Sequence, residues 1–335
     1  KNQDPFRNVY SIFNHKDILF GNLETSLTET GSKTDKAVVL STNPKNIKFL
    51  KKADFDVLNL ANNHILDLGE EGFAKTIRTL QENNMGYVGA DYKNTPEILF
   101  LEQKGIIFAF LGYSIGRFKT SPDVHINKIR ERKILADIDL VKNKCDFIIV
   151  SLHWGTENVF YPSPSQIKLA HKIIDHGATL ILGHHPHTIQ GIEEYNNGLI
   201  VYSLGNFQFD PKLSQSKSNK SMIVSVKFDK NRIFGYDIVP VSIKEDIPEL
   251  MEQRFIEKYM EFISKISEPI NRKISRLWWF QEIGSEYLSN NIHSYKMRIG
   301  KYGIFHLIEF ILWLFTPFCL CCYVGIISKK IRVIF

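Results

Sequence analysis

Short apolar runs alternate with amphipathic stretches of helical period from about Asp17 to Ile243. The apolar runs have the length of a strand, and they include DILFGN, FDVLNLANN, IIFAFLGY, CDFIIVSLHWG, ATLILGHH, LIVYSLGNF and MIVSVKFD. The helical stretches include EEGFAKTIRTLQENN and SPSQIKLAHKIIDHG, and the second opens with serine and proline and closes with glycine, as helices commonly do. Buried strands that alternate with helices predict a layered α/β domain.

Five of these runs lead directly into a polar motif that contains asparagine, glutamate or histidine. The motifs are GNLE (21–24), ANNHILDLG (61–69), HWGTE (153–157), GHHPH (183–187) and SLGNF (203–207). In α/β sheets, functional residues gather in the loops at the carboxyl ends of strands. One such motif would be ambiguous, but five that carry metal-competent side chains predict convergence on a single site.

The residue types in the motifs favour one class of metal site. Carboxylate, amide oxygen and several imidazoles, without thiolate, suit Mn, Fe, Zn or Co rather than a structural zinc knot. One or two such divalent ions polarise a phosphoryl or acyl oxygen and generate hydroxide at neutral pH. His185 and His187 can direct two imidazoles toward neighbouring metals, and His64, which follows Asn63, is placed to protonate a leaving group.

In this order, the motifs resemble the CapA/PgsA family of capsule and poly-γ-glutamate synthesis proteins, itself similar to calcineurin-like metallophosphoesterases. The match runs from about Asp4 to Ile243. The resemblance implies a β-sandwich flanked by helices, with a divalent-metal site at the strand ends. It also implies a phosphoesterase-like hydrolase whose catalytic domain lies outside the cytoplasm. The implied substrate is an extracellular anionic polymer or a phosphorylated compound, and other capsule synthase subunits are candidate partners.

The resemblance also implies a role for individual residues. Glu24, Asn63, His153, His185 and His187 match the family's metal ligands, and His64 matches its catalytic histidine. The residues expected around these ligands or in the substrate pocket are Asn22, Asn62, Asp67, Glu157, His184 and Asn206. One departure is plain, because the family usually opens with a strand that ends in Gly-Asp and no such motif precedes Asp4. We therefore expect a chain that begins after that strand, with one metal ligand missing.

Each motif also has a simpler interpretation. A single histidine at a strand end is more often a hydrogen-bonded structural residue than a ligand. Glu24 can cap the turn that follows it, and Asn62 and Asn63 can be turn residues. At the level of function, the alternative is a non-catalytic accessory subunit of a membrane polymer synthase or exporter that only holds an anionic chain. A lipid or cell-wall phosphoesterase is a third hypothesis.

The C-terminal third differs in character and predicts three further regions. Residues 1–247 are expected to form the metallophosphatase domain, 248–302 a helical region, 303–327 an apolar segment and 328–335 a basic tail. Residues 303–327 are long enough to cross a bilayer and are flanked by lysine and arginine, although His306, Glu309 and Pro317 interrupt them. We therefore expect membrane association, with spanning and interfacial binding both open.

Charge and cysteine content bear on nucleic-acid binding and on disulfide or zinc frameworks. The formal net charge is only +6, with 42 basic and 36 acidic residues, and the chain carries no nucleic-acid-binding signature. We therefore expect no nucleic-acid partner. The four cysteines, three of them within 319–322, fit neither a disulfide framework nor a zinc spacing.

Overall fold

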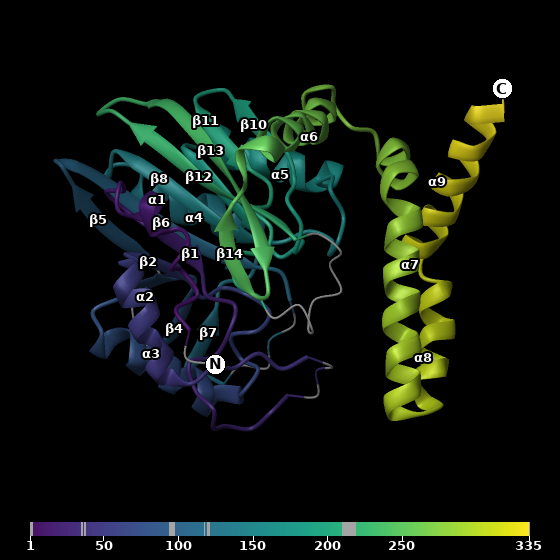
Figure 1. Ribbon diagram of the computed structural model, residues 1–335, viewed down its shortest axis with the longest axis horizontal. Helices are drawn as coiled ribbons and strands as arrows, with labels where there is room; N and C mark the ends of the chain where they lie inside the picture. Colours follow the sequence, from purple (N-terminus) through teal and green to yellow (C-terminus); the bar gives the residue numbers. More distant parts are fainter. Residues whose placement is uncertain are drawn as a thin grey trace.

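The computed structural model describes residues 3–34, 36, 38–93, 98–116, 118, 121–209 and 219–334. It confirms the mixed α/β class. Sheets and their covering helices form one body, and three C-terminal helices lie at its edge, one long helix with two shorter helices that follow each other alongside it (Figure 1).

A six-stranded sheet forms the centre of the body. Its strand order is β10 (Ile192–Tyr195), β11 (Gly198–Val201), β9 (Leu180–His184), β8 (Phe147–His153), β6 (Ile106–Ser114) and β5 (Leu99–Gln103). The four inner strands are parallel, and each edge strand pairs antiparallel with its neighbour. The carboxyl ends of β8 and β9 therefore meet at the same edge, where His153 pairs in register with His184.

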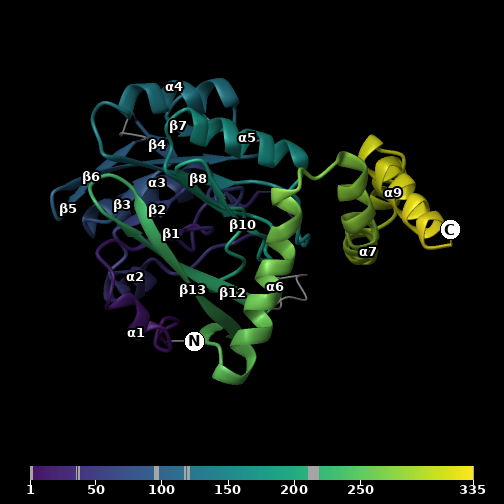
Figure 2. The same cartoon turned by 90° about the horizontal axis from the view of Figure 1, so that it is seen from above.

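Successive side chains of a strand point to opposite faces of the sheet, and both sets are apolar in the inner strands, so both faces of this sheet are buried. On one face, Ile148, Val150 and Leu152 of β8 pack against helices α4 (Glu131–Val141) and α5 (Pro164–Asp175). On the other face, Phe147 and Ile149 pack against a second sheet. That antiparallel sheet consists of β12 (Lys220–Phe228), β13 (Ile233–Lys244) and β14 (Ile247–Leu250). Two sheets thus share one core, with helices outside it (Figure 2).

A smaller parallel sheet continues the body. It contains β1 (Phe20–Asn22), β2 (Val57–Asn59) and β3 (Gly86–Val88). The surrounding short elements are α1 (Tyr10–Phe13), η1 (Pro44–Asn46), α2 (Ile47–Ala53), α3 (Gly69–Glu82), β4 (Ala90–Tyr92) and β7 (Val124–Ile126). Val57 and Val88 belong to the same core cluster as β8 and β9, so the small sheet is packed onto the large one. Its carboxyl ends carry Asn22 and Asn59.

The body extends beyond the expected boundary at residue 247. That residue is the first of β14, which pairs with β13. Helix α6 (Gln253–Asn271) then buries Tyr259, Ile263 and Ile266 in the core between the two sheets. The reason is amphipathic patterning, since these side chains recur at helical spacing and require an apolar face to cover them.

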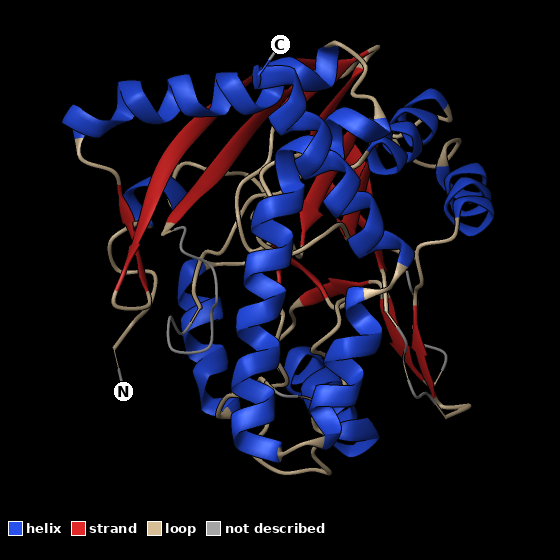
Figure 3. Ribbon diagram, turned by 90° about the vertical axis from the view of Figure 1, so that its right-hand side faces the viewer, coloured by secondary structure: helices blue, strands red, loops and turns tan. Residues whose placement is uncertain are grey.

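Residues 303–327 do not form the single long segment that we expected. They are divided between α8 (Phe305–Leu314) and α9 (Pro317–Ile334), because Pro317 lacks the amide hydrogen needed to continue α8. Within the described residues, no individual helix is both long and apolar enough to cross a bilayer; α8 and α9 together have that length and composition but are bent by 54°. Both helices pack on α7 (Arg276–Tyr302), and the three C-terminal helices are nearest the viewer in Figure 3. The region 328–335 was expected to be a separate basic tail, but its residues up to 334 continue α9.

Candidate metal centre

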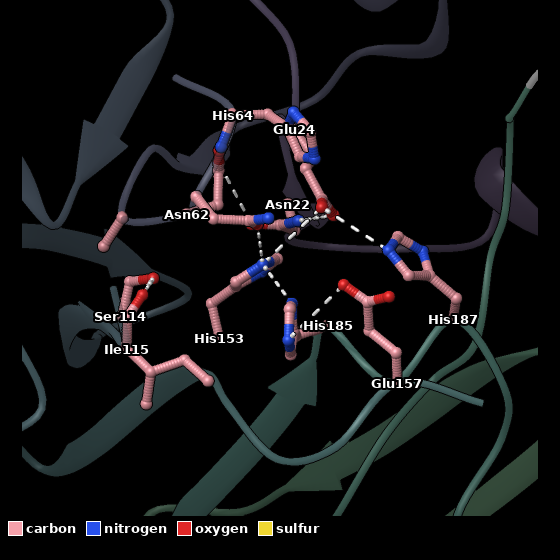
Figure 4. A network of polar contacts seen from close by, with 12 residues as sticks. Asn22, Glu24, Asn62, His64, Ser114, Ile115, His153, Glu157, His185 and His187 are labelled. Carbon is pink, nitrogen blue, oxygen red and sulfur yellow. Dashed lines mark hydrogen bonds and ion pairs between the residues drawn. The ribbon is translucent and has the colours of Figure 1, made fainter. Parts of the chain in front are cut away.

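Two groups of ligand-competent side chains lie at the edge where the strands end. Glu24, His153 and His185 form one group, and Glu157, His185 and His187 form the other. Within each group the ligand atoms lie within 4.8 Å of one another. His185 belongs to both, as Figure 4 shows, so the arrangement can serve one ion or two adjacent ions. The structure thus brings together four of the five expected ligands, and adds Glu157, which we expected around the ligands.

The fifth expected ligand, Asn63, also faces this group. Its Oδ1 atom lies 2.7 Å from Nε2 of His153. The same His153 nitrogen lies 3.2 Å from Nδ1 of His185 and 3.6 Å from Oε1 of Glu24. One carboxylate oxygen, one amide oxygen and two imidazole nitrogens therefore converge on a small volume. This is a mixed nitrogen and oxygen donor set without sulfur, which fits a catalytic divalent metal.

Two atoms of these ligand residues are buried without a hydrogen-bond partner among the described residues, and burial also shifts the pKa values of the ligands. Oε1 of Glu24 and Nδ1 of His153 are buried and have no hydrogen-bond partner among the described residues. Burial raises the pKa of Glu24 above its ordinary value. Burial also lowers the pKa of His153 well below its ordinary value, with help from neighbouring histidines, and lowers that of His185 to about 4. Both imidazoles are thus held neutral at physiological pH, which is the form that binds a metal.

The GHHPH loop places its histidines through an unusual backbone. His185 has φ +95° and His187 has φ +56°, a region that residues other than glycine rarely adopt. Such strain persists only where the surroundings enforce it, and it is common at functional sites. Gly183 precedes the loop because β9 and β11 approach closely there: a Cβ atom at this position would lie 1.9 Å from the carbonyl oxygen of Tyr202.

Amide side chains orient the ligands from outside the two groups. Asn206 Oδ1 lies 2.8 Å from Nδ1 of His187, which leaves Nε2 of that ring facing Glu24 at 3.8 Å. Asn22 donates from Nδ2 to Oε2 of Glu24 at 3.2 Å. Two predicted members of the surrounding set therefore hold ligands in place, as partners of metal ligands commonly do.

His64 lies beside the ligands and is oriented by a carboxylate. Its Nδ1 atom is 2.6 Å from Oδ2 of Asp67, which is fully buried. Asp67 also accepts bonds from Lys36 Nζ at 2.6 Å and from the Leu40 amide at 2.8 Å. Burial would raise the pKa of Asp67, but the bonds from His64 and Lys36 outweigh it and hold that pKa below its ordinary value. The ionised carboxylate fixes Nδ1–H of His64 and leaves Nε2 available for proton transfer.

Two predicted residues occupy positions away from the ligand groups. His184 ends β9 with its side chain buried near the Phe20 ring, and burial lowers its pKa to about 3. Asn62 is buried and binds backbone atoms, donating to the Leu23 carbonyl and accepting from the His64 amide. Asn62 therefore shapes the loop that carries His64.

Two residues that contact the candidate site were not predicted from the sequence, namely Lys36 and Asn59. Lys36 contacts both Asp67 and the carbonyl oxygen of Asn63, but it comes from a loop with no local signal. Asn59 ends β2 and donates to Asn22 Oδ1 at 2.9 Å. It is wholly buried in an otherwise apolar strand, a signal that could have identified it.

Comparisons with known proteins show which proteins this chain is similar to. A family model described as "Bacterial capsule synthesis protein PGA_cap" matches residues 1–211. "Capsule biosynthesis protein CapA" of Bacillus anthracis is 35% identical over 262 residues, which cover 72% of this chain and 62% of that protein. "PGA biosynthesis protein CapA" of Bacillus subtilis (strain 168) is 33% identical over 261 residues, 72% of this chain and 66% of that protein. The chain thus spans a little under two thirds of each of these relatives.

A solved structure is similar at a lower level. It is a hypothetical protein from Thermus thermophilus, with 17% identity, a TM-score of 0.45, and coverage of 69% of this chain and 90% of that one. These values are too low to support an inference about fold or activity.

Proposed function

The chain belongs to the family of bacterial capsule synthesis proteins, and on that premise we propose that it is a metal-dependent, phosphoesterase-like hydrolase acting in capsule or poly-γ-glutamate synthesis. One observation carries the proposal. Two groups of metal ligands share His185, and a histidine held by a buried aspartate stands beside them. A second observation, the convergence of the five strand-end motifs on this site, is our ground for assigning the α/β body to the metallophosphoesterase type.

The ligand groups would hold one or two divalent ions of the Mn, Fe, Zn or Co class. Such an ion, when bound, supplies Lewis-acid polarisation of a phosphoryl oxygen and lowers the pKa of water. The protein's own contribution is a neutral, pre-oriented imidazole set. Asn206 and Asn22 fix the ring of His187 and the carboxylate of Glu24, so little reorganisation accompanies binding.

His64 would donate a proton to the leaving group. Asp67 holds its Nδ1, and the Asn62 side chain holds its backbone amide, so the ring has a fixed tautomer and a fixed position. A positioned acid of this kind contributes about 10²–10⁴ in rate. Loss of Asp67 would act through His64, because the carboxylate orients the ring without reaching the substrate.

We further propose an anionic polymer or a phosphorylated compound as substrate, at the cell envelope, with the body outside the cytoplasm. Other capsule synthase subunits are the proposed protein partners. The support is the capsule-related function named for the relatives.

Metal content and catalysis test the proposal in sequence. Mass spectrometry should find stoichiometric transition metal in the purified protein, and His185→Ala should remove it, whereas the exposed control His15→Ala should retain it. Hydrolysis of bis(p-nitrophenyl) phosphate should then fall by about 10²-fold or more in His64→Ala with the metal retained. Bound metal with no hydrolysis of any phosphoester, and polymer production unchanged by His64→Ala, would instead support the accessory role.

A further inference from the structure

Helix α8 is largely apolar and contacts α7 on one side, yet its other side is exposed in the described structure. None of its residues is buried, and Phe305 and Leu312 are 78% and 67% exposed. The exposed apolar side chains continue along α9 at helical spacing, and together they form a surface that we name the outer stripe. Its members are Ile304, Phe305, Leu307, Ile308, Ile311, Leu312, Phe315, Leu320, Val324, Ile327 and Ile331. A contiguous apolar patch of this kind indicates an interaction surface.

The outer stripe faces away from the α/β body. Figure 1 places α7 between the body and the pair α8–α9, and Figure 2 shows α9 on the side of α7 that is farther from the body. The opposite face of α9 packs on α7, where Cys319 and Cys322 are buried against Phe280 and Ile283. Gly284 of α7 permits the close approach, because a Cβ atom there would lie 3.0 Å from the Cys322 carbonyl oxygen. The outer stripe is therefore the exposed side of helices α8 and α9, whose opposite side is held against α7.

Charge indicates what covers this surface. Residues 276–334 carry seven lysines and arginines against three glutamates. Lys296 on α7 and Lys330 near the end of α9 are both exposed. Lys296 follows Tyr295, whose ring contacts Phe310 and Trp313, so one cation lies beside the middle of the outer stripe and the other lies at its end. Apolar side chains bordered by cations match the interface of a membrane that contains anionic lipids. A second copy of the same basic layer would instead bring like charges together.

The structure also indicates how such a membrane is engaged. Helix α7 packs along both α8 and α9, and most of the exposed side chains in its central part are polar, among them Ser285, Glu286, Ser289 and His293. If α8 and α9 crossed a bilayer, these groups would be drawn into hydrocarbon. Glu309 is exposed beside the outer stripe, where shallow insertion lets its carboxylate reach the head groups. The 54° bend also suits two helices that follow a surface.

We infer that α8 and α9 lie in the plane of an anionic membrane surface, with the outer stripe in the acyl boundary and α7 on the water side. The anchor is attached to the metal centre. Trp279 of α7 donates from Nε1 to the Tyr161 carbonyl at 2.9 Å, and the Trp278 and Tyr161 rings meet at 5.1 Å. Tyr161 belongs to the loop after β8 that carries Glu157, so binding would hold the centre at a set distance from the lipid.

Vesicle co-sedimentation of the full chain tests this arrangement. We expect binding to phosphatidylcholine vesicles that contain phosphatidylglycerol, and a fall of at least about a hundredfold for Ile308→Glu/Leu312→Glu, because two apolar side chains are lost. The matched control is Leu140→Glu/Phe234→Glu, which alters two exposed apolar residues of the body and should bind normally. Lys296→Glu/Lys330→Glu should weaken binding only when phosphatidylglycerol is present.

Three results would overturn the inference. The first is equal vesicle binding by the stripe variant and the unaltered chain, with circular dichroism confirming that both are folded. The second is the absence of vesicle binding together with a dimer in sedimentation velocity that the stripe variant dissociates, which would assign the surface to a second copy. The third is protection of a C-terminal tag from external protease in sealed vesicles, since an in-plane anchor leaves that tag accessible.

Discussion

Replacement of Glu24 by glutamine separates a metal ligand from a structural carboxylate. Without metal, the Glu24 side chain destabilises the folded protein. Its Oε1 atom is buried without a hydrogen-bond partner among the described residues, and its Oε2 atom accepts only the bond from the side-chain amide of Asn22. No lysine or arginine lies within ion-pair distance in the described part of the chain. Glutamine keeps the shape and removes the charge. We therefore expect opposite effects on the metal-free and the metal-loaded protein.

The magnitudes follow from burial and mass action. Burial of a carboxylate charge costs more than burial of a neutral amide, so Glu24→Gln should raise the free energy of unfolding of the metal-free protein at pH 7 by about 1–3 kcal/mol. Metal at 100 times its dissociation constant adds about 2.7 kcal/mol, and a tenfold loss of affinity removes about 1.4 kcal/mol of this. Each kcal/mol corresponds to roughly 2 °C in Tm for a chain of this size.

The pH dependence provides an independent check. Burial raises the pKa of Glu24, so the folded state disfavours the ionised form. The destabilisation appears as pH rises from the ordinary value of 4.5 through the raised pKa, and it vanishes at lower pH, where the carboxyl is neutral. The advantage of glutamine should therefore disappear as pH falls toward 4.

Thermal unfolding with and without Mn²⁺ or Zn²⁺, at several pH values, measures both effects. Glu257→Gln, at an exposed position on α6, is the matched control and should change neither. Suppose instead that Glu24→Gln destabilises the metal-free protein and retains the full metal-dependent rise in Tm. The carboxylate would then be a structural cap, and the ligand assignment would be wrong.

Three other perturbations have defined outcomes. Gly183→Ala should lower the free energy of unfolding by about 3 kcal/mol in chemical denaturation, because the new methyl group would clash with the Tyr202 carbonyl oxygen. The control Gly235→Ala has open space around it and should change the free energy of unfolding little. Equal effects of the two substitutions would contradict the close approach of the backbone at Gly183. Burial lowers the pKa of His184 to about 3, so on acidification the unfolded chain takes up a proton before the folded protein does. The free energy of unfolding should therefore fall between pH 6.5 and about 3, and His184→Leu should reduce that fall. An unchanged pH profile of the variant would show that His184 does not cause the fall. Asp67→Asn should reduce turnover about 10²-fold or more with metal content unchanged, and loss of metal instead would show that Asp67 supports the ligands.

The sequence identified the elements and most of the site because both depend on local order. The continuous apolar run of β8 specifies a strand that is buried on both faces, and that property can be read from consecutive residues. Glu24, Asn63, His153, His185 and His187 stand at the ends of such runs, and the structure brings all five together. Parallel pairing places the ends of β1 and β2 at one edge of the small sheet and the ends of β8 and β9 at one edge of the large sheet. Packing of the small sheet onto the large one then brings these two edges together.

Tertiary structure alone decided the contacts that join distant segments. Lys36 reaches Asp67 across 31 positions from a loop without a pattern, and Glu157 lies among the ligands because its loop folds back over His185. The C-terminal segment shows the same limit. Its hydrophobicity suggested membrane contact, but the break at Pro317 and the exposed polar side chains in the centre of α7 are what favour an in-plane anchor over a span. Composition records how much apolar surface a segment has, whereas only packing determines which side of it remains uncovered.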